Sequence, residues 1–222
     1  MAQIRSKPFG VTRQGANVTE YILSNPGGLT VSVLDYGCII KNIIVPAKNG
    51  PVDVVLGHDT MADYEDDFTS SGSTCCGAFV GRYANRIANG QFYIDSIRYN
   101  IPQNNNGQSL HGGLKGLDQV IWDVDSVTPN KIFLSYTSPD GEEGYPGTLK
   151  LNMDYSLTDD NEFIIQYHAT TDKPTVINLS HHGFFNLKGE GRGSINDHLL
   201  TIYADSITPV NDVLIPTGQL MA

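Results

Sequence analysis

Short strand-like runs recur along this 222-residue chain, and turn-forming residues separate them about every ten residues. The acidic residues divide into 18 Asp and only 6 Glu, and the chain also contains 17 Asn and 23 Gly. Asp, Asn and Gly favour tight turns, whereas Glu favours helices. The sequence therefore predicts an all-β fold in which many antiparallel strands form a sandwich or a barrel.

The predicted strands are spread over most of the chain. Segment 29–34 alternates between apolar and polar residues, and the runs 92–94 and 97–101 flank Asp95-Ser96, which predicts a two-residue hairpin turn. The remaining predicted strands are 38–45, 52–56, 120–127, 131–138, 148–157, 163–171, 175–180 and 199–204. One helix is predicted over 59–66, with Asp59 or Thr60 as its N-cap. We find no repeat or linker, so we expect residues 1–222 to form a single domain.

Charge and cysteine content exclude several classes of partner and site. The 14 Lys and Arg against 24 Asp and Glu give a net charge of −10, which disfavours nucleic acid or an anionic membrane as the partner. Cys38, Cys75 and Cys76 form neither an even disulfide framework nor a Cys-x-x-Cys metal pair. With no apolar signal core at the N-terminus and no apolar span, we expect a cytoplasmic protein.

Two long loops, 75–90 and 104–115, carry side chains suited to chemistry. Long loops in a compact domain are usually functional or disordered, and the apolar residues within these two favour function. The first loop contains Arg82 and Arg86, four residues apart, which either bind an oxygen-rich ligand or form a solvated or salt-bridged pair. His111 lies in the second loop beside two glycines, where it either contacts a ligand or caps a turn.

Two adjacent histidines, His181 and His182, follow the predicted strand 175–180. Successive side chains of a strand point to opposite faces, so His182 shares a face with Asn178 and Ser180, and His181 lies with the apolar residues. His182 therefore faces a polar cavity or is a structural histidine; the pattern leaves both open. The acidic loop 139–147 lacks the spacing of a calcium loop and is predicted to be a structured turn.

The chain lacks the glycine-rich nucleotide motifs, the nucleophile elbow of hydrolases and the His-Glu-x-x-His zinc motif. Uncharged polar residues, histidines and a few arginines on a β-scaffold suit a neutral, polyhydroxylated ligand. Four ordered motifs then resemble the galactose mutarotase (aldose 1-epimerase) family. They are GRYANRIANG at 81–90, SLHGG at 109–113 with Trp122 beyond it, SPDGEEGYPG at 138–147, and NLSHHGFFNL at 178–187.

The resemblance implies a large antiparallel β-sandwich that interconverts the α and β anomers of free hexoses such as galactose and glucose. It assigns His182 as the general acid that protonates the sugar ring oxygen, and it places His111 near that oxygen. It assigns Asn85 and Arg86 to the binding of sugar hydroxyls. Neither a metal nor an organic cofactor is implied.

The resemblance covers the N-terminal two-thirds of the family domain, so the family's sugar-binding Asp and general-base Glu are expected beyond Ala222. Since a general base contributes about 10²–10⁴-fold, we expect little or no activity from residues 1–222 alone, and an exposed sheet edge and core. The family usually has Asn at 181 and Ser-Tyr after 182, so the preferred sugar is not implied. Two alternatives are a hexose-6-phosphate 1-epimerase, disfavoured by the acidic composition, and a non-catalytic carbohydrate-binding sandwich, disfavoured by His111 and His182.

Overall fold

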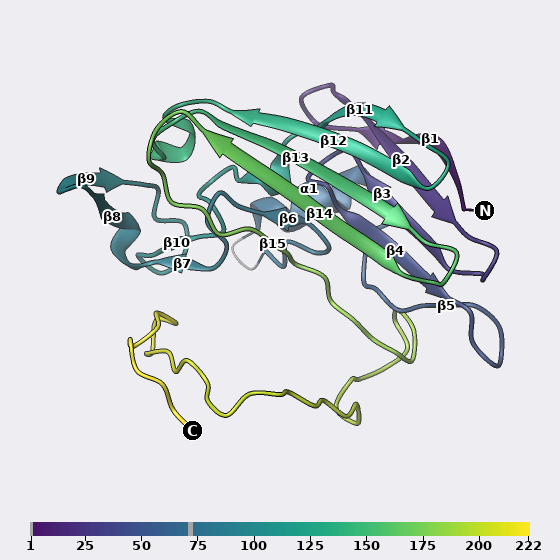
Figure 1. Cartoon of the computed structure of the whole chain (residues 1–222). Helices are drawn as coiled ribbons and strands as arrows, with labels where there is room; N and C mark the ends of the chain where they lie inside the picture. Colours follow the sequence, from purple (N-terminus) through teal and green to yellow (C-terminus); the bar gives the residue numbers. More distant parts are fainter. Residues whose placement is uncertain (1, 71–72) are drawn as a thin grey trace.

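The computed structural model describes residues 2–70 and 73–222, and two antiparallel sheets dominate it (Figure 1). The first sheet has the order β1-β2-β3-β4-β5, formed by Gln3–Val11, Asn17–Ser24, Thr30–Leu34, Ile40–Val45 and Val52–Asp53. The second has the order β11-β12-β13-β14, formed by Asp123–Val127, Lys131–Ser138, Leu149–Leu157 and Phe163–Thr171. Sequence neighbours are also sheet neighbours, as expected for strands joined by short turns.

The two sheets pack face to face around one apolar core. Val31 and Val33 of β3 belong to the same buried cluster as Leu134 of β12 and Leu151 and Met153 of β13. Alternate residues are buried over the first six residues of β13, which is the period expected of a strand with one face on a core. The predicted antiparallel all-β sandwich is therefore confirmed.

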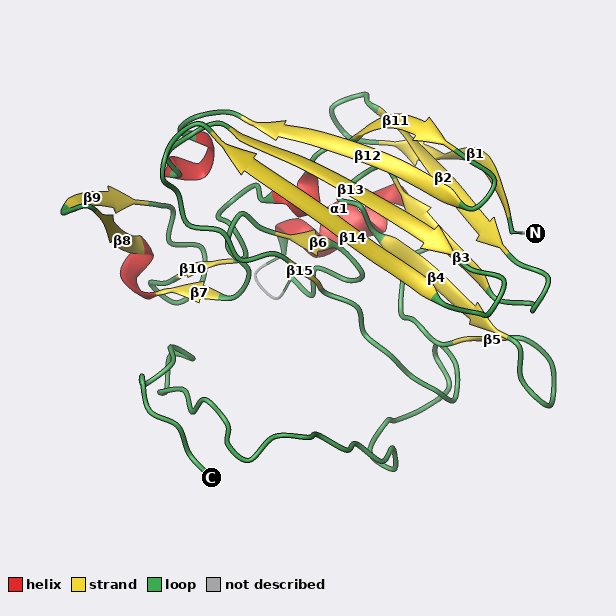
Figure 2. Cartoon of the chain, viewed as in Figure 1, coloured by secondary structure: helices red, strands yellow, loops and turns green. Residues whose placement is uncertain are grey.

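Shorter strands and helical turns lie within the loops beside the two large sheets (Figure 2). Three two-stranded pairs form, from β6 (Phe79–Val80) with β15 (Ser180–His181), β7 (Arg86–Ile87) with β10 (Ser109–Leu110), and β8 (Gln91–Ile94) with β9 (Ile97–Asn100). The helices are α1 (Met61–Thr69) and the 3-10 turns η1 (Ala88–Gly90), η2 (Leu117–Gln119) and η3 (Glu142–Gly144). None of the helices in residues 2–70 and 73–222 is long and apolar enough to cross a membrane.

Several local predictions are confirmed. The turn between β8 and β9 consists of Asp95 and Ser96, with φ of 48° and 67°, as a two-residue hairpin turn requires. The N-cap of α1 is Thr60, whose side chain accepts a hydrogen bond from the Asp63 backbone N–H. The predicted strands 131–138 and 163–171 coincide with β12 and β14.

Two predicted strands are wrong. Within 175–180 only Ser180 enters a strand, and Asn178 forms a single bridge to Tyr83. Segment 199–204 forms no strand, and Leu199 and Tyr203 are 100% and 99% exposed. Both runs have the apolar and β-branched residues of strands, but strand propensity acts through packing against a neighbouring strand. No described segment pairs with 199–204, so these residues form no strand.

Candidate functional site

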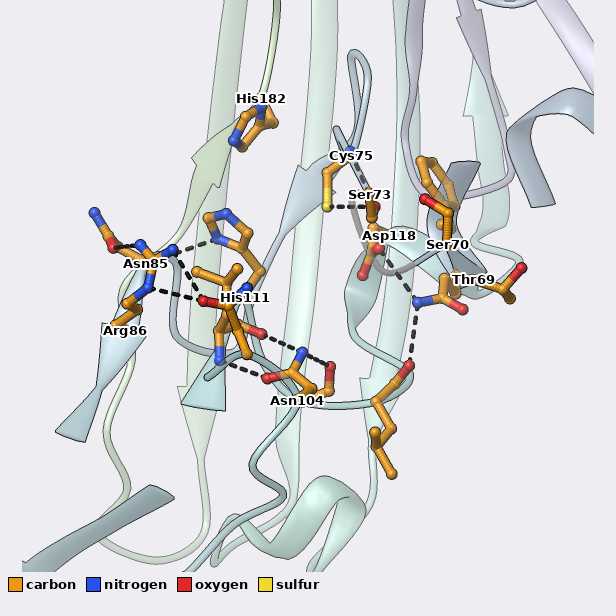
Figure 3. A pocket seen from close by; sticks show the side chains of 16 residues that line it. Thr69, Ser70, Ser73, Cys75, Asn85, Arg86, Asn104, His111, Asp118 and His182 are labelled. Carbon is orange, nitrogen blue, oxygen red and sulfur yellow. Dashed lines mark hydrogen bonds between the residues drawn. The ribbon is translucent and has the colours of Figure 1, made fainter. Parts of the chain in front are cut away.

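A cleft of about 690 Å³ opens beside the sandwich and contains the predicted site residues (Figure 3). Its wall comes from the end of α1, the loop before β6, the β7–β10 pair, η2 and the residue after β15. Asn85, Arg86, His111 and His182 all line it. The structure thus brings together, from three separate segments, the four residues that the family resemblance selects.

Pairing of β7 with β10 places Asn85 and Arg86 beside His111. Arg86 is opposite Leu110 in the register, and the His111 backbone N–H donates to the Asn85 carbonyl at 3.1 Å. The following Gly112 has φ of 104°, and a Cβ there would lie 1.9 Å from the Gly81 carbonyl oxygen. Only glycine fits at this close approach of two loops, which explains the first glycine of the His-Gly-Gly sequence.

The protonation state of His111 follows from its hydrogen bond. The Asn85 backbone N–H donates to His111 Nδ1 at 2.9 Å, so Nδ1 carries no hydrogen and the hydrogen of the neutral ring is on Nε2. Burial, followed by the nearby His182 and Arg86, lowers the pKa of His111 to about 4. His111 is therefore a neutral imidazole that donates from Nε2.

Two asparagines orient the Arg86 guanidinium. Its Nε and Nη2 donate to Asn105 Oδ1 at 3.2 and 3.1 Å, and its Nη1 donates to Asn85 Oδ1 at 3.3 Å. A guanidinium has five N–H donors, so this arrangement fixes the fork while leaving further donors for oxygen atoms of a ligand.

The backbone of His182 is held on both sides. Its N–H donates to the Ala78 carbonyl at 2.8 Å, and its carbonyl accepts from the Gly77 N–H at 3.0 Å. The imidazole ring lies edge-on to that of His111, with 5.1 Å between the ring centroids. His181 instead contacts Phe79 and Tyr155, on the core side of β15. His181 and His182 thus lie on opposite sides, as predicted, although the segment 175–180 from which the alternation was extended is not a strand.

Sequence reasoning missed two residues on the wall of the cleft. Asn104 holds the loop of His111, because its Nδ2 donates to the carbonyls of Leu110 and Gly113 and its Oδ1 accepts from the Leu110 N–H. Asp118 lies near Cys75 (Figure 3), and burial raises its pKa to about 7. Three consecutive asparagines at 104–106 were a signal for a specific loop; nothing marked Asp118.

Arg82 does not line the cleft. It is 3% exposed, and its five N–H groups donate to the Ser138 hydroxyl and to the carbonyls of Ser138, Pro139, Pro146 and Gly147. The two arginines are therefore neither a ligand-binding pair nor a solvated one, because Arg82 binds the loop 139–147 from inside. That loop is a structured turn, as predicted.

The same part of the chain, residues 2–70 and 73–222, contains no group of three or more His, Cys, Asp or Glu side chains that could hold a metal ion. The arrangement instead offers one neutral imidazole donor, a second imidazole and an oriented guanidinium around a polar cleft. Such a set suits hydrogen bonds to hydroxyl groups and proton transfer.

Comparison with known proteins agrees with the geometry. A family described as aldose 1-epimerase matches residues 19–222. The chain belongs to this family. It is 41% identical to the galactose mutarotase of Bos taurus over 221 residues, which are 99% of this chain and 63% of that protein. It is 35% identical to the aldose 1-epimerase of Escherichia coli (strain K12), over 89% of this chain and 56% of that protein.

Solved structures show the same fold. The GalM/aldose epimerase homologue from C. elegans has a TM-score of 0.82 and 32% identity, over 97% of this chain and 61% of that one. The galactose 1-epimerase from Lactobacillus acidophilus NCFM has a TM-score of 0.71 and 27% identity, over 84% of this chain and 54% of that one. The chain thus spans less than two-thirds of the length of these relatives.

Proposed function

We propose that this chain provides the sugar-binding cleft and the general acid of an aldose 1-epimerase that interconverts the α and β anomers of free hexoses such as galactose and glucose. The observation that carries the proposal is the meeting of His111 and His182, 5.1 Å apart between ring centroids, beside the oriented Arg86. The names of the relatives support the same reaction.

Anomer exchange requires a proton at the ring oxygen and loss of one from the C1 hydroxyl, which opens the ring to an aldehyde. His182 gives the first proton, and after rotation about the C1–C2 bond it takes the proton back as the ring closes on the other face, while the base returns its proton to the C1 oxygen. His111 donates a hydrogen bond from its neutral Nε2–H towards the ring oxygen. Asn85 and Arg86 hold hydroxyl groups of the sugar, so that the ring meets His182 in one orientation. The proposed route assigns no step to a metal or a cofactor.

The proposed reaction also needs a base that takes the proton of the C1 hydroxyl. No glutamate lines the cleft among the described residues, and the carboxyl on its wall is that of the buried Asp118. We therefore expect residues 1–222 to bind hexoses and to exchange their anomers slowly, about 10²–10⁴-fold below a mutarotase with a general base.

Titration of the 222-residue protein with galactose, followed by NMR, tests the binding half of the proposal, and polarimetry or exchange spectroscopy tests the turnover. We expect saturable binding and an exchange rate above that of buffer but far below that of the bovine galactose mutarotase. His182→Gln should remove the excess rate, whereas the same change at the exposed His168 should not.

Three results decide between the alternatives. Absence of galactose binding would contradict the proposed function, and binding without any exchange would favour a carbohydrate-binding module. Tighter binding of glucose 6-phosphate than of glucose would favour a hexose-6-phosphate epimerase. We expect no such preference, because Arg86 is the one Arg or Lys among the described residues that line the cleft, and its guanidinium is already hydrogen-bonded to two asparagines.

A further inference from the structure

The proposed reaction gives no role to His181, although this residue makes close contacts. Its Nε2 lies 2.6 Å from the Tyr155 hydroxyl, and its ring packs at 5.0 Å from that of Phe79 and 5.6 Å from that of Tyr155, measured between centroids. Tyr155 belongs to β13, in the middle of the second sheet, and is fully buried. His181 thus connects the short strand β15 to the centre of the sandwich.

The direction of each hydrogen bond in this cluster can be assigned. The Tyr155 hydroxyl lies 2.6 Å from the Cys38 carbonyl, which can only accept, so the single hydrogen of the phenol is directed to Cys38. With that hydrogen directed to Cys38, we assign the contact between Tyr155 and His181 as donated by His181, from Nε2–H. Burial lowers the pKa of His181 to about 4, so the ring is neutral and its hydrogen is the one on Nε2.

The hydrogen bonds from His181 to Tyr155 and from Tyr155 to Cys38 bear on the orientation of the next residue, His182. β15 is only two residues long, and the side chain of Ser180 is exposed, so His181 provides the side-chain anchor of the strand. The His182 backbone is bonded to Gly77 and Ala78, and the register pairs His181 with Phe79. Rotation or slippage of β15 would break the bond to Tyr155 and would turn the His182 imidazole away from His111.

We propose that His181 is a positioning residue, whose Nε2–H bond to Tyr155 holds β15 in the register that presents His182 to the cleft. The catalytic consequence rests on the proposed function, but the anchoring itself does not. A displacement of the acid relative to the sugar lowers the rate more than the affinity, because Arg86 and Asn85 still hold the hydroxyls.

The test compares variants of the 222-residue protein by long-range ¹H–¹⁵N NMR of the histidine rings, galactose titration and anomer exchange. Tyr155→Phe keeps the aromatic ring and removes the acceptor, and His181→Leu removes the donor. His181→Gln keeps an N–H donor near the position of Nε2 and is the rescue variant. Tyr93→Phe and His168→Leu are matched controls, because both residues are exposed.

We expect the wild-type spectrum to show His181 as the Nε2–H tautomer. Tyr155→Phe and His181→Leu should shift the ring signals of His182 and lower the exchange rate about tenfold, with galactose affinity changed less than about twofold. His181→Gln should restore most of the rate, and the two controls should match the wild type.

An Nδ1–H tautomer of His181, or unshifted His182 signals in both Tyr155→Phe and His181→Leu, would overturn the proposal. Equal losses in the rescue variant and in His181→Leu would also overturn it, since they would show a packing role alone. If wild-type protein showed no response to galactose, the proposed function would fail, while the tautomer and the His182 signals would still decide the anchoring. The wild-type tautomer needs no substitution, so it remains decisive if a variant does not fold.

Discussion

In the proposed reaction, the neutral His111 has a different role from that of His182, which releases a proton. His111 accepts at Nδ1 from Asn85 and lies beside His182 and Arg86, so a proton added to its ring would lose the Asn85 bond and meet a neighbouring cation. Its role is therefore hydrogen-bond donation, and the proton transfer falls to His182.

This assignment predicts the titration of His111. In the folded protein its ring should remain neutral as the pH falls through 6.5 and should become protonated only near pH 4, because burial disfavours the charged form. ¹⁵N shifts of the imidazole, recorded against pH, measure this directly. In concentrated urea the same ring should titrate near the ordinary value of about 6.5. A midpoint near 6.5 in the folded protein would show that the ring is solvated and that the donor role is wrong.

Residue patterns predicted part of this site and missed another part for a physical reason. Alternation predicts that His181 and His182 face opposite sides, and this holds because the two-residue strand β15 forms even though segment 175–179 is not a strand. Residue type and loop context made Arg86 and His111 candidates, and the family resemblance added Asn85 and a role for each of the three. Asn104 was not selected, although its partners Leu110 and Gly113 lie in the same loop 104–115, because a run of asparagines does not show which carbonyl groups each amide will bind.

Around strand β7, two arginines four residues apart have different roles. Arg82 precedes β7 and binds the carbonyls of loop 139–147 in the interior, whereas Arg86 begins β7 and faces the cleft. Spacing in sequence contains no information on which of two loops will fold over a side chain. The sequence therefore predicts one role for the pair, whereas the structure buries Arg82 in the interior and places Arg86 at the cleft.

Matched substitutions should separate the two roles. Arg82→Lys leaves several buried carbonyls without donors, so we expect the free energy of unfolding to fall by about 2–4 kcal/mol, with galactose affinity per folded molecule nearly unchanged. Arg86→Lys loses the fork to Asn105 and Asn85; it should weaken galactose binding about tenfold and change stability by less than about 0.5 kcal/mol. Urea denaturation and NMR titration measure the two quantities. A reversed pattern would place Arg82 at the ligand and contradict the site.

Strand prediction succeeded where the partner strand is near in sequence. β8 and β9 were predicted as a hairpin because a two-residue turn sets their register. Segment 199–204 failed because composition predicts that a run can form a strand, while the neighbouring strand decides whether it does. β1 went unrecognised for a related reason: Pro8 and Gly10 interrupt its pattern at a bulge that an edge strand tolerates.

For the whole molecule, buried titratable groups link the site to stability. Burial raises the pKa of Asp118 from its ordinary value of 3.8 to about 7. Between these two pH values, the native protein therefore holds a proton on Asp118 that the unfolded chain has released. Native stability from this group is therefore fully present below pH 3.8 and is lost as the pH rises through 7. His111 and His181, with pKa values lowered to about 4, act in the opposite sense between pH 4 and 6.5.

Asp118→Asn isolates the first contribution, because asparagine keeps the shape and cannot ionise. The free energy of unfolding of the variant, minus that of the wild type, should rise with pH by about 1.4 kcal/mol per unit between pH 4 and 7 and should then level off. The histidines are common to both proteins and cancel in this difference. Urea denaturation at half-unit pH steps gives the curve. A difference independent of pH would mean that Asp118 titrates as it does in the unfolded chain. The cleft would then carry an ordinary carboxylate on its wall, and that carboxylate would have to be tested as the missing base by measuring anomer exchange in the same variant.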